Sequence, residues 1–325
     1  MTLLEVNDLQ TEFRTGGKTV QAVRGVSFKI EKGETVGLVG ESGSGKSVTS
    51  LSIMGLIPSP PGRIASGSIK MDGVELVGMP EKEFRKIRGS EMAMVFQDPF
   101  SCLNPTMTIG AQVAEPLLLH KSMSRSEAKE KAIQLLTSVR IPSPEIRYKQ
   151  YPHEISGGQR QRVMIAMAFA CNPKALIADE PTTALDVTVQ AQILALMSEM
   201  QEKTETGILL ITHDLGVVAE VCDRVLVMYA GQIVESGTSA QLFKEPKHPY
   251  AQGLLASLPH VGANRSRRLP SIPGQPPDLA NLPVGCPFFA RCSQRIVGTC
   301  NTKEPEITIF PSGQDVRCHL YGNLL

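Results

Sequence analysis

Several features that this sequence of 325 residues lacks exclude whole classes of protein. It has no run of about 18 consecutive apolar residues, so we expect no membrane-spanning helix. Residues 1–8 carry acidic side chains where a signal peptide carries basic ones. The formal net charge is only +1, which argues against nucleic acid as a partner and against binding to a membrane surface by charge. We therefore expect a soluble cytoplasmic protein, which would reach a membrane through a partner.

The most informative stretch runs from Gly40 to Ser47 and reads GESGSGKS. It follows a strand-like apolar run and precedes a helix-like one, which is the context that the phosphate-loop pattern G-x-x-x-x-G-K-[ST] requires. The glycines let backbone N–H groups turn toward phosphates, and the helix start adds a partial positive charge. Lys46 is suited to reach the β- and γ-phosphates, and the Ser47 hydroxyl to bind Mg²⁺. We predict a nucleoside triphosphate site that includes Gly40, Ser42, Gly43, Gly45, Lys46 and Ser47.

The rest of the chain has the pattern of an α/β protein. Residues 3–14 and 20–30 alternate apolar and polar side chains, which predicts two antiparallel strands that turn at Gly16-Gly17. An Asp72-Gly73 pair predicts a second hairpin. Residues 124–139 have helical apolar spacing and begin with a capping box. After residue 174, apolar strands alternate with helices, which indicates a sheet covered by helices.

Polar residues at three strand ends extend the nucleotide site. Asp179 ends an apolar strand and is suited to hold Mg²⁺ directly or through water, while Glu180 is suited to polarise the attacking water. Gln97 ends an earlier strand, and its amide could reach both the metal and the water. His213 follows a later strand and could contact the γ-phosphate. A lone Gln or His at a strand end is more often structural, so these two count only together with the others.

Residues Ser156 to Gln159, which read SGGQ, form a second helix start with small residues. Such a start can bind an anion, but this one lacks the lysine of a phosphate loop. One phosphate loop and one separate phosphate-binding helix start imply two chains that face each other. Each chain would then supply its second site to the nucleotide of its partner.

These motifs, in this order, resemble the ATP-binding subunits of ATP-binding-cassette (ABC) transporters over residues 1 to about 245. The resemblance implies a P-loop NTPase of the ABC cassette fold: an α/β RecA-like core, an antiparallel β subdomain and a helical insert at about 100–165. It implies ATP and Mg²⁺ as cofactors and a head-to-tail pair of cassettes around two ATP. It assigns Glu180, His213 and Gln97 to catalysis and Ser47, Gln97 and Asp179 to Mg²⁺. It also assigns a nucleotide contact to Phe13, although the ring of Phe13 could instead belong to the core. Further nucleotide contacts are assigned to Ser156, Gly157, Gly158 and Gln159, and to Asp186 of the D-loop Ala184-Leu185-Asp186.

Three further stretches, at residues 97–105, 248–255 and 283–292, look like the dipeptide/oligopeptide importer ATPases. That resemblance implies ATP hydrolysis that powers peptide import, at the cytoplasmic face of the cell membrane. The implied partners are a second ATPase subunit, two membrane permeases and an extracytoplasmic peptide-binding protein. The alternatives are another cargo, such as nickel or an oligosaccharide, and a cassette protein outside transport. The latter would carry a long coiled coil or two cassettes, and neither occurs in this sequence.

The C-terminal extension, residues 246–325, holds four of the seven cysteines. Five, seven and seventeen residues separate Cys286, Cys292, Cys300 and Cys318. A reducing cytosol disfavours disulfides, and the C-x₂₋₄-C pairs usual for structural zinc are absent. The wide all-cysteine spacing suits a [4Fe–4S] cluster, which the resemblance also implies, with Zn²⁺ or free thiols as alternatives. The scattered Cys102, Cys171 and Cys222 are interpreted as ordinary buried thiols.

Overall fold

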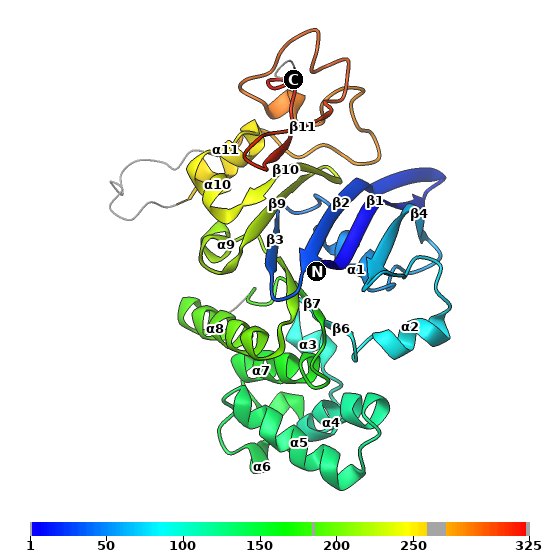
Figure 1. Cartoon of the computed structure of the whole chain (residues 1–325), viewed down its shortest axis with the longest axis vertical. Helices are drawn as coiled ribbons and strands as arrows, with labels where there is room; N and C mark the ends of the chain where they lie inside the picture. Colours follow the sequence, from blue (N-terminus) through cyan, green and yellow to red (C-terminus); the bar gives the residue numbers. More distant parts are fainter. Residues whose placement is uncertain (1, 184–185, 259–270, 323–325) are drawn as a thin grey trace. The chain divides into compact units, whose positions relative to one another are not determined.

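The computed structural model describes residues 2–183, 186–258 and 271–322 of the chain (Figure 1). The chain divides into two compact units, each assembled from separate segments. The first unit consists of Met1–Leu4, Ile30–Glu34 and Met71–Ile211. The second consists of Glu5–Lys29, Thr35–Lys70 and Thr212–Leu325.

In the second unit, five strands lie in the order β11-β12-β10-β9-β3. Strands β3 and β9 pair in parallel, whereas β10 runs antiparallel to both β9 and β12, and β11 antiparallel to β12. All five residues of β3 are buried, including Thr35 at its start, and the mostly apolar sequence TVGLV suits this burial. The C-terminal strands β11 and β12 thus belong to the same sheet as β3, the strand that leads into the phosphate loop. The bounds are β3 (Thr35–Val39), β9 (Arg224–Tyr229), β10 (Gln232–Thr238), β11 (Ile307–Ile309) and β12 (Asp315–Arg317).

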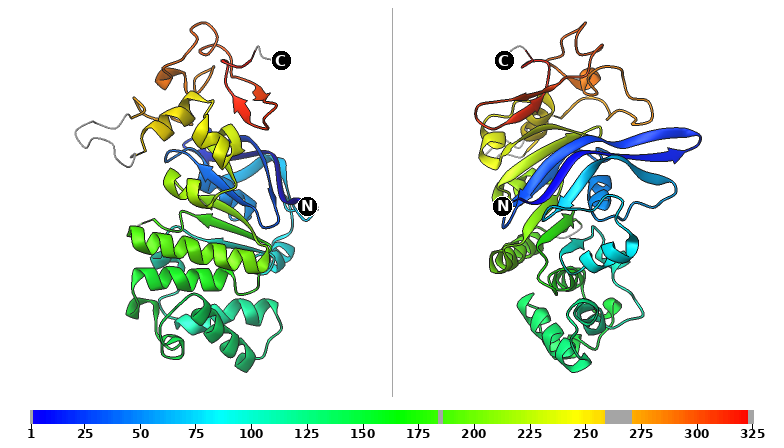
Figure 2. Two further views of the ribbon diagram at one scale, coloured as in Figure 1. Left: turned by 60° about the vertical axis from the view of Figure 1, so that its left-hand side comes forward. Right: turned by 45° about the vertical axis from the view of Figure 1, so that its right-hand side comes forward.

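The long strands β1 (Thr2–Thr15) and β2 (Lys18–Glu31) form a hairpin, with β4 (Gly62–Met71) on the other side of β1 (Figure 2). Gly16 and Gly17 between β1 and β2 have φ values of 57° and 77°, the left-handed backbone of a type I′ turn. Asp72 and Gly73, which precede β5 (Val74–Glu75), have φ values of 46° and 79°. Both hairpins predicted from the sequence are therefore confirmed.

The helices of the second unit are short. Apart from the helix that follows the phosphate loop, none of them was predicted, because short helices carry little periodicity. Their starts nevertheless have side-chain caps: Asp214 accepts hydrogen bonds at the start of α9, and Thr238 forms a capping box with Gln241 at the start of α10. The bounds are α1 (Lys46–Ile53), α9 (Leu215–Val221), α10 (Ser239–Lys244), α11 (Pro249–Ala256) and the 3₁₀ helix η2 (Phe289–Arg291).

In the first unit, three strands lie side by side in the order β8-β7-β6 and pair in parallel. Every residue of the central strand β7 and of β8 is buried. The bounds are β6 (Met92–Val95), β7 (Ala175–Asp179) and β8 (Gly207–Ile211). The carboxyl ends of β6 and β7 thereby place Gln97 and Asp179 at one edge of this sheet.

Helices α4, α5 and α7 pack against one another in the same unit (Figure 1). The apolar stripe of α5 is buried, and its capping box between Ser124 and Glu127 is present as predicted. Among the described residues, no helix combines the length and the apolar character that crossing a membrane requires. The bounds are α2 (Glu81–Ile87), α3 (Pro99–Cys102), α4 (Ile109–His120), α5 (Arg125–Ser138), α6 (Pro144–Arg147), η1 (Pro152–Glu154), α7 (Gly157–Ala168) and α8 (Val187–Thr204).

Candidate nucleotide-binding site

The phosphate loop joins β3 to α1 in the second unit, and close packing explains its glycines. A Cβ atom at Gly40 would lie 2.2 Å from the carbonyl oxygen of Met228, and one at Gly45 would lie 2.5 Å from that of Ala22. Gly43 has a φ of +78°, and nothing lies within 4 Å of the place where its Cβ would be. The first two glycines are therefore required by space and Gly43 by its backbone conformation.

Donor groups gather at this loop. The Lys46 ammonium donates hydrogen bonds to the carbonyl oxygens of Gly40, at 2.8 Å, and Glu41, at 3.0 Å. Ser44 is 5% exposed, and its hydroxyl has no hydrogen-bond partner among the described residues. A buried hydroxyl without a partner is costly, so a phosphate oxygen at this place would complete its bonding. Ser42 and Ser47 lie at the exposed side of the loop. The sequence pattern predicts both of these but not Ser44, whose burial the pattern does not reveal.

In the first unit, the structure brings Gln97 and Glu180 together. The Gln97 amide donates a hydrogen bond to the Glu180 carboxylate at 3.0 Å, and the Thr183 hydroxyl donates to the same oxygen at 2.8 Å. Asp179, one residue earlier, ends β7 and is 6% exposed. Thr183 was not predicted from the sequence, because a threonine in a turn carries no signal of its own. Together these residues fix a carboxylate at the end of a buried strand.

The backbone of Glu180 is held in an unusual conformation. Its φ of 47° lies in the left-handed region, which costs a non-glycine residue about 1 kcal/mol. Its N–H donates to the carbonyl oxygen of Ile211 at 2.8 Å. The Gln161 side chain, from α7, donates a short hydrogen bond to the carbonyl oxygen of Pro181 in the following turn. These contacts hold the strained turn in place, and strain of this kind concentrates at functional sites.

The Ser156–Gln159 segment begins α7, as predicted. The Ser156 hydroxyl accepts a hydrogen bond from the Gln159 N–H at 3.4 Å, and the Gln159 side chain accepts one from the Ser156 N–H at 3.2 Å. Ser156 is exposed, so this capped helix start faces solvent in the chain. A Cβ at Gly158 would lie 3.2 Å from Val189, which leaves little room for a larger residue.

Three further candidates lie at separate places. Asp186 caps α8 by accepting a hydrogen bond from the Val189 N–H at 3.0 Å; the Ala184 and Leu185 of the predicted D-loop lie outside the described residues. In the second unit, His213 is exposed just before α9. Phe13, in the same unit, is half-buried against Gly62, where a Cβ would lie 2.7 Å from its ring. The ring is therefore neither a full core residue nor a fully exposed one.

The four C-terminal cysteines lie near one another in the second unit. Burial, with a smaller contribution from the neighbouring thiols, raises the pKa of Cys286 and of Cys318 to about 11. The Cys286 N–H donates to the carbonyl oxygen of Cys300 at 2.7 Å. Within the described part of the chain, however, no group of three or more His, Cys, Asp or Glu side chains is arranged to hold a metal ion. The predicted [4Fe–4S] or Zn²⁺ site at Cys286, Cys292, Cys300 and Cys318 is thus not supported as a ligand arrangement.

The remaining cysteines give one correction. Cys171 and Cys222 are buried as predicted, but Cys102 is exposed. It lies on the short helix α3 beside Phe100, which is itself 66% exposed. The guanidinium of Arg160 lies 4.0 Å from the centre of the Phe100 ring. A short helix with an exposed aromatic ring therefore follows closely after Gln97.

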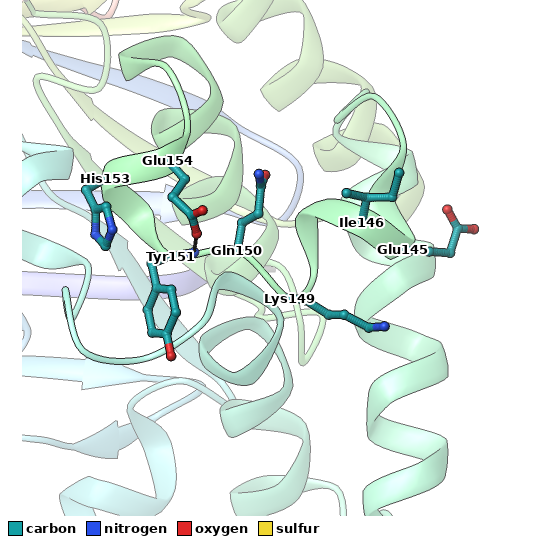
Figure 3. Close-up of a pocket in the computed structure, with 7 residues that line it drawn as sticks. All are labelled: Glu145, Ile146, Lys149, Gln150, Tyr151, His153 and Glu154. Atoms are coloured by element: carbon teal, nitrogen blue, oxygen red, sulfur yellow. Dashed lines mark hydrogen bonds between the residues drawn. The ribbon is translucent and has the colours of Figure 1, made fainter.

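A pocket of about 610 Å³ opens just before the Ser156–Gln159 segment (Figure 3). Tyr151 and His153 lie on one side of it, with ring centres 5.7 Å apart, and Ile146 on the other. Ile146 is 64% exposed. The full lining is Glu145, Ile146, Lys149, Gln150, Tyr151, His153 and Glu154.

Comparison with known families identifies the chain. The family described as "ABC transporter" matches residues 23–183, and "Oligopeptide/dipeptide transporter, C-terminal region" matches residues 234–300. The oligopeptide transport ATP-binding protein AppD of Bacillus subtilis is 54% identical over 320 residues, which cover 98% of this chain and 97% of AppD. The chain belongs to the ABC transporter family. Among other relatives of this ABC protein, Bacillus subtilis OppD is 58% identical over 291 residues, covering 90% of the chain and 81% of OppD. The dipeptide transport ATP-binding protein DppD of the same organism is 53% identical, covering 98% and 94%.

Solved structures confirm the ABC cassette fold. The ATP-binding cassette MJ0796, in a dimeric post-hydrolysis state bound to ADP and Pi, is 28% identical, with a TM-score of 0.65. The match covers 73% of this ABC protein and 98% of that chain. The cbiO1 subunit of the cbiONQ transporter from Clostridium perfringens matches with a TM-score of 0.63 and covers 75% and 91%.

Proposed function

We propose that this chain is the ATP-hydrolysing subunit of an importer of oligopeptides or dipeptides. The observation that carries this function is the loop from Gly40 to Ser47, with its inward lysine and its buried Ser44 hydroxyl, which has no hydrogen-bond partner in the described part of the chain. Peptide as the cargo is supported by the relatives, since OppD, AppD and DppD are described as oligopeptide or dipeptide transport ATP-binding proteins.

Different residues of the chain bind the phosphates, hold the metal and activate the water. The loop residues Gly40, Ser42, Gly43, Gly45, Lys46 and Ser47, together with Ser44, bind the phosphates of ATP, and Phe13 supports the base. Ser47, Gln97 and Asp179 would hold Mg²⁺, which would neutralise charge on the phosphates. Glu180 accepts the proton of the attacking water while the water oxygen bonds to the γ-phosphorus and ADP leaves. Gln97 and Thr183 keep the Glu180 carboxylate in place, and His213 contacts the γ-phosphate.

A second cassette subunit completes each site. Ser156, Gly157, Gly158, Gln159 and Asp186 belong to the face offered to the nucleotide of the partner. This assignment is supported by the exposure of Ser156 at a capped helix start, and by the dimeric structure of the similar cassette MJ0796. Membrane permeases and an extracytoplasmic peptide-binding protein are the remaining partners, so the chain works at the cytoplasmic face of the membrane.

The permease contact would use the exposed apolar surface of the first unit. Phe100, on the short helix α3 after Gln97, and the pocket lined by Ile146 and Tyr151 offer aromatic and aliphatic surface to a partner. Arg160 links the two, because its guanidinium lies on Phe100 and donates to the carbonyl oxygen of Pro152 at 2.7 Å. A partner seated there would therefore contact the segment that follows Gln97, whose amide bonds to Glu180, and the segment that precedes Ser156.

A separate proposal concerns the four C-terminal cysteines: we infer that they bind a [4Fe–4S] cluster with a structural or regulatory role. The inference is supported by the donor chemistry, since four thiols with this wide sequence spacing lie near one another in the second unit. Iron and acid-labile sulfide in anaerobically purified protein test it. Near-equal amounts of both would support the cluster, whereas an iron-free preparation that carries one zinc would overturn it.

Hydrolysis and cargo need separate experiments. Glu180→Gln should trap ATP with little hydrolysis, and an undiminished rate in the assembled complex would overturn the role of Glu180. Cargo is tested by thermal stabilisation of the cognate binding protein. Peptides should raise its melting temperature; stabilisation by nickel or an oligosaccharide instead would overturn the peptide assignment and leave the ATPase role intact.

A further inference from the structure

The C-terminal extension holds the second residue of the phosphate loop. The backbone N–H of Glu41 donates to the Tyr250 hydroxyl at 2.8 Å. The Glu41 carboxylate accepts two hydrogen bonds from Arg291, at 2.6 and 2.9 Å. In addition, the Glu41 carbonyl oxygen accepts a hydrogen bond from the Lys46 ammonium at 3.0 Å. One loop residue is therefore bonded both to the phosphate-binding lysine and to two residues that follow it in sequence by more than 200 positions.

Arg291 is itself firmly positioned. Its side chain is 4% exposed, and its Nε donates to the carbonyl oxygen of Pro273 at 3.0 Å. Its guanidinium lies 5.8 Å from the ring centre of Tyr229 and 5.9 Å from that of Phe288. The hydrogen bonds to Glu41 raise the pKa of Arg291 above its ordinary value. A bidentate pair with this little exposure is stronger and more directional than a surface ion pair.

An aromatic cluster supports the same contact. Tyr229 ends β9, and its ring centre lies 4.6 Å from that of Tyr250 and 5.2 Å from that of Phe288. Tyr250 and Phe288 are in contact at 5.4 Å, and Tyr250 is fully buried. The rings fix the distance between the extension and the strand beside β3, from which the loop leaves. Tyr250 and Arg291 thus meet Glu41 from a rigid support.

The charge of Glu41 gives this contact a consequence for ATP. A carboxylate at the second position of a phosphate loop repels the anionic phosphates that the loop binds. Arg291 neutralises that carboxylate through two parallel bonds, and its own side chain is only 4% exposed whereas that of Glu41 is 28% exposed. Without Arg291, Glu41 would be both unneutralised and free to turn toward the phosphates.

We propose that Arg291 is a positioning residue for the phosphate loop, so that the C-terminal extension sets the affinity of the chain for ATP. Arg291 acts through Glu41 and does not itself touch the nucleotide. This role rests on the proposed binding of ATP at the loop, and it adds a function to the segment that carries Cys286 and Cys292.

The test measures MgATP binding and steady-state hydrolysis by the full-length chain. Arg291→Met should weaken ATP binding about tenfold, the effect of one uncompensated charge, and raise KM while leaving kcat at saturating ATP within about twofold. Arg291→Lys keeps the positive charge but cannot form the two parallel hydrogen bonds of a guanidinium, so it should weaken ATP binding about threefold. Arg295→Met is the matched control, because Arg295 belongs to the same segment but is exposed and lies over Phe289. It should bind ATP like the wild type.

The double variant separates charge from packing. Glu41→Gln alone should bind ATP within about twofold of the wild type, since the repelling charge is gone. Glu41→Gln combined with Arg291→Met should then recover most of the affinity that Arg291→Met loses. A merely structural arginine predicts the opposite, because removing both partners cannot repair lost packing.

Two results would overturn the role of Arg291: wild-type ATP affinity in Arg291→Met and Arg291→Lys, or a double variant that binds no better than Arg291→Met. Thermal unfolding of each variant shows that it is folded, and Arg291→Lys serves if the Met variant is not. Lys46→Ala distinguishes this role from the proposed ATP site. If Lys46→Ala binds ATP normally, the proposed site itself fails. If Lys46→Ala loses binding while the Arg291 variants keep it, only the role of Arg291 fails.

Discussion

Buried His248 should make the protein less stable in mild acid. It caps α11, its Nδ1 accepts a hydrogen bond from the Tyr250 N–H at 3.0 Å, and its backbone N–H donates to the buried Glu235 at 2.7 Å. The side chain is 2% exposed, and burial lowers its pKa to about 3. In the unfolded chain, histidine has a pKa of about 6.5. Between these values the unfolded state binds a proton that the folded state does not.

The sign and size of the effect follow from this difference. Stability is lost as the pH falls below about 6.5, because protonation then favours the unfolded chain. Between pH 7.5 and pH 5.5, His248 should cost about 1.4 kcal/mol of the free energy of unfolding. Glu235 has a pKa raised by burial and acts with the opposite sign in acid, so the effect of His248 must be isolated by comparison.

The comparison uses His248→Asn, which can still cap α11 but does not titrate. Urea unfolding of both proteins, followed by circular dichroism, gives the free energy of unfolding at pH 7.5 and 5.5. The variant should be less stable overall, yet the wild type should lose about 1.4 kcal/mol more than the variant between the two values of pH. Equal losses in the two proteins would refute a neutral, buried His248.

Three further predictions concern the site. Thr183→Val should lower kcat for ATP hydrolysis about tenfold, since the Glu180 carboxylate loses a hydrogen bond. Thr183→Ser keeps the hydroxyl and should therefore hydrolyse ATP at the wild-type rate. Equal kcat values for Thr183→Val and the wild type would contradict this role of Thr183. Gly40→Ala should abolish MgATP binding in a titration, because its Cβ would clash with the carbonyl oxygen of Met228. Gly43→Ala places its Cβ in open space, so it should weaken MgATP binding only about fivefold, through backbone strain. Phe100→Ala should stop peptide uptake by the assembled transporter while MgATP binding persists, and normal uptake would exclude that surface from the permease contact.

Local signals in the sequence predicted the strands, the hairpins and the phosphate loop. The Asp72-Gly73 turn needs left-handed backbone, and the Gly40–Ser47 pattern needs its flanking strand and helix, so each signal lies within a few residues of its consequence. The capping box at Ser124 is of the same kind. What such patterns could not supply is the identity of residues that meet from distant parts of the chain.

The missed residues share that property. Arg291 contacts Glu41 across 250 positions, and no periodicity or motif connects the two. Ser44 is marked only by burial without a partner, which depends on the whole loop. The prediction for Cys102 was wrong for a related reason: a thiol is usually buried, but this one is exposed on the short helix α3. Tertiary context decided all three.

The most direct test of the proposed function is peptide uptake by the complete transporter, reconstituted in vesicles with its binding protein. Uptake should require ATP hydrolysis: it should be rapid with wild-type subunits, and absent with Glu180→Gln even though that variant retains bound ATP. Peptide uptake by the Glu180→Gln transporter at the wild-type rate would contradict this function.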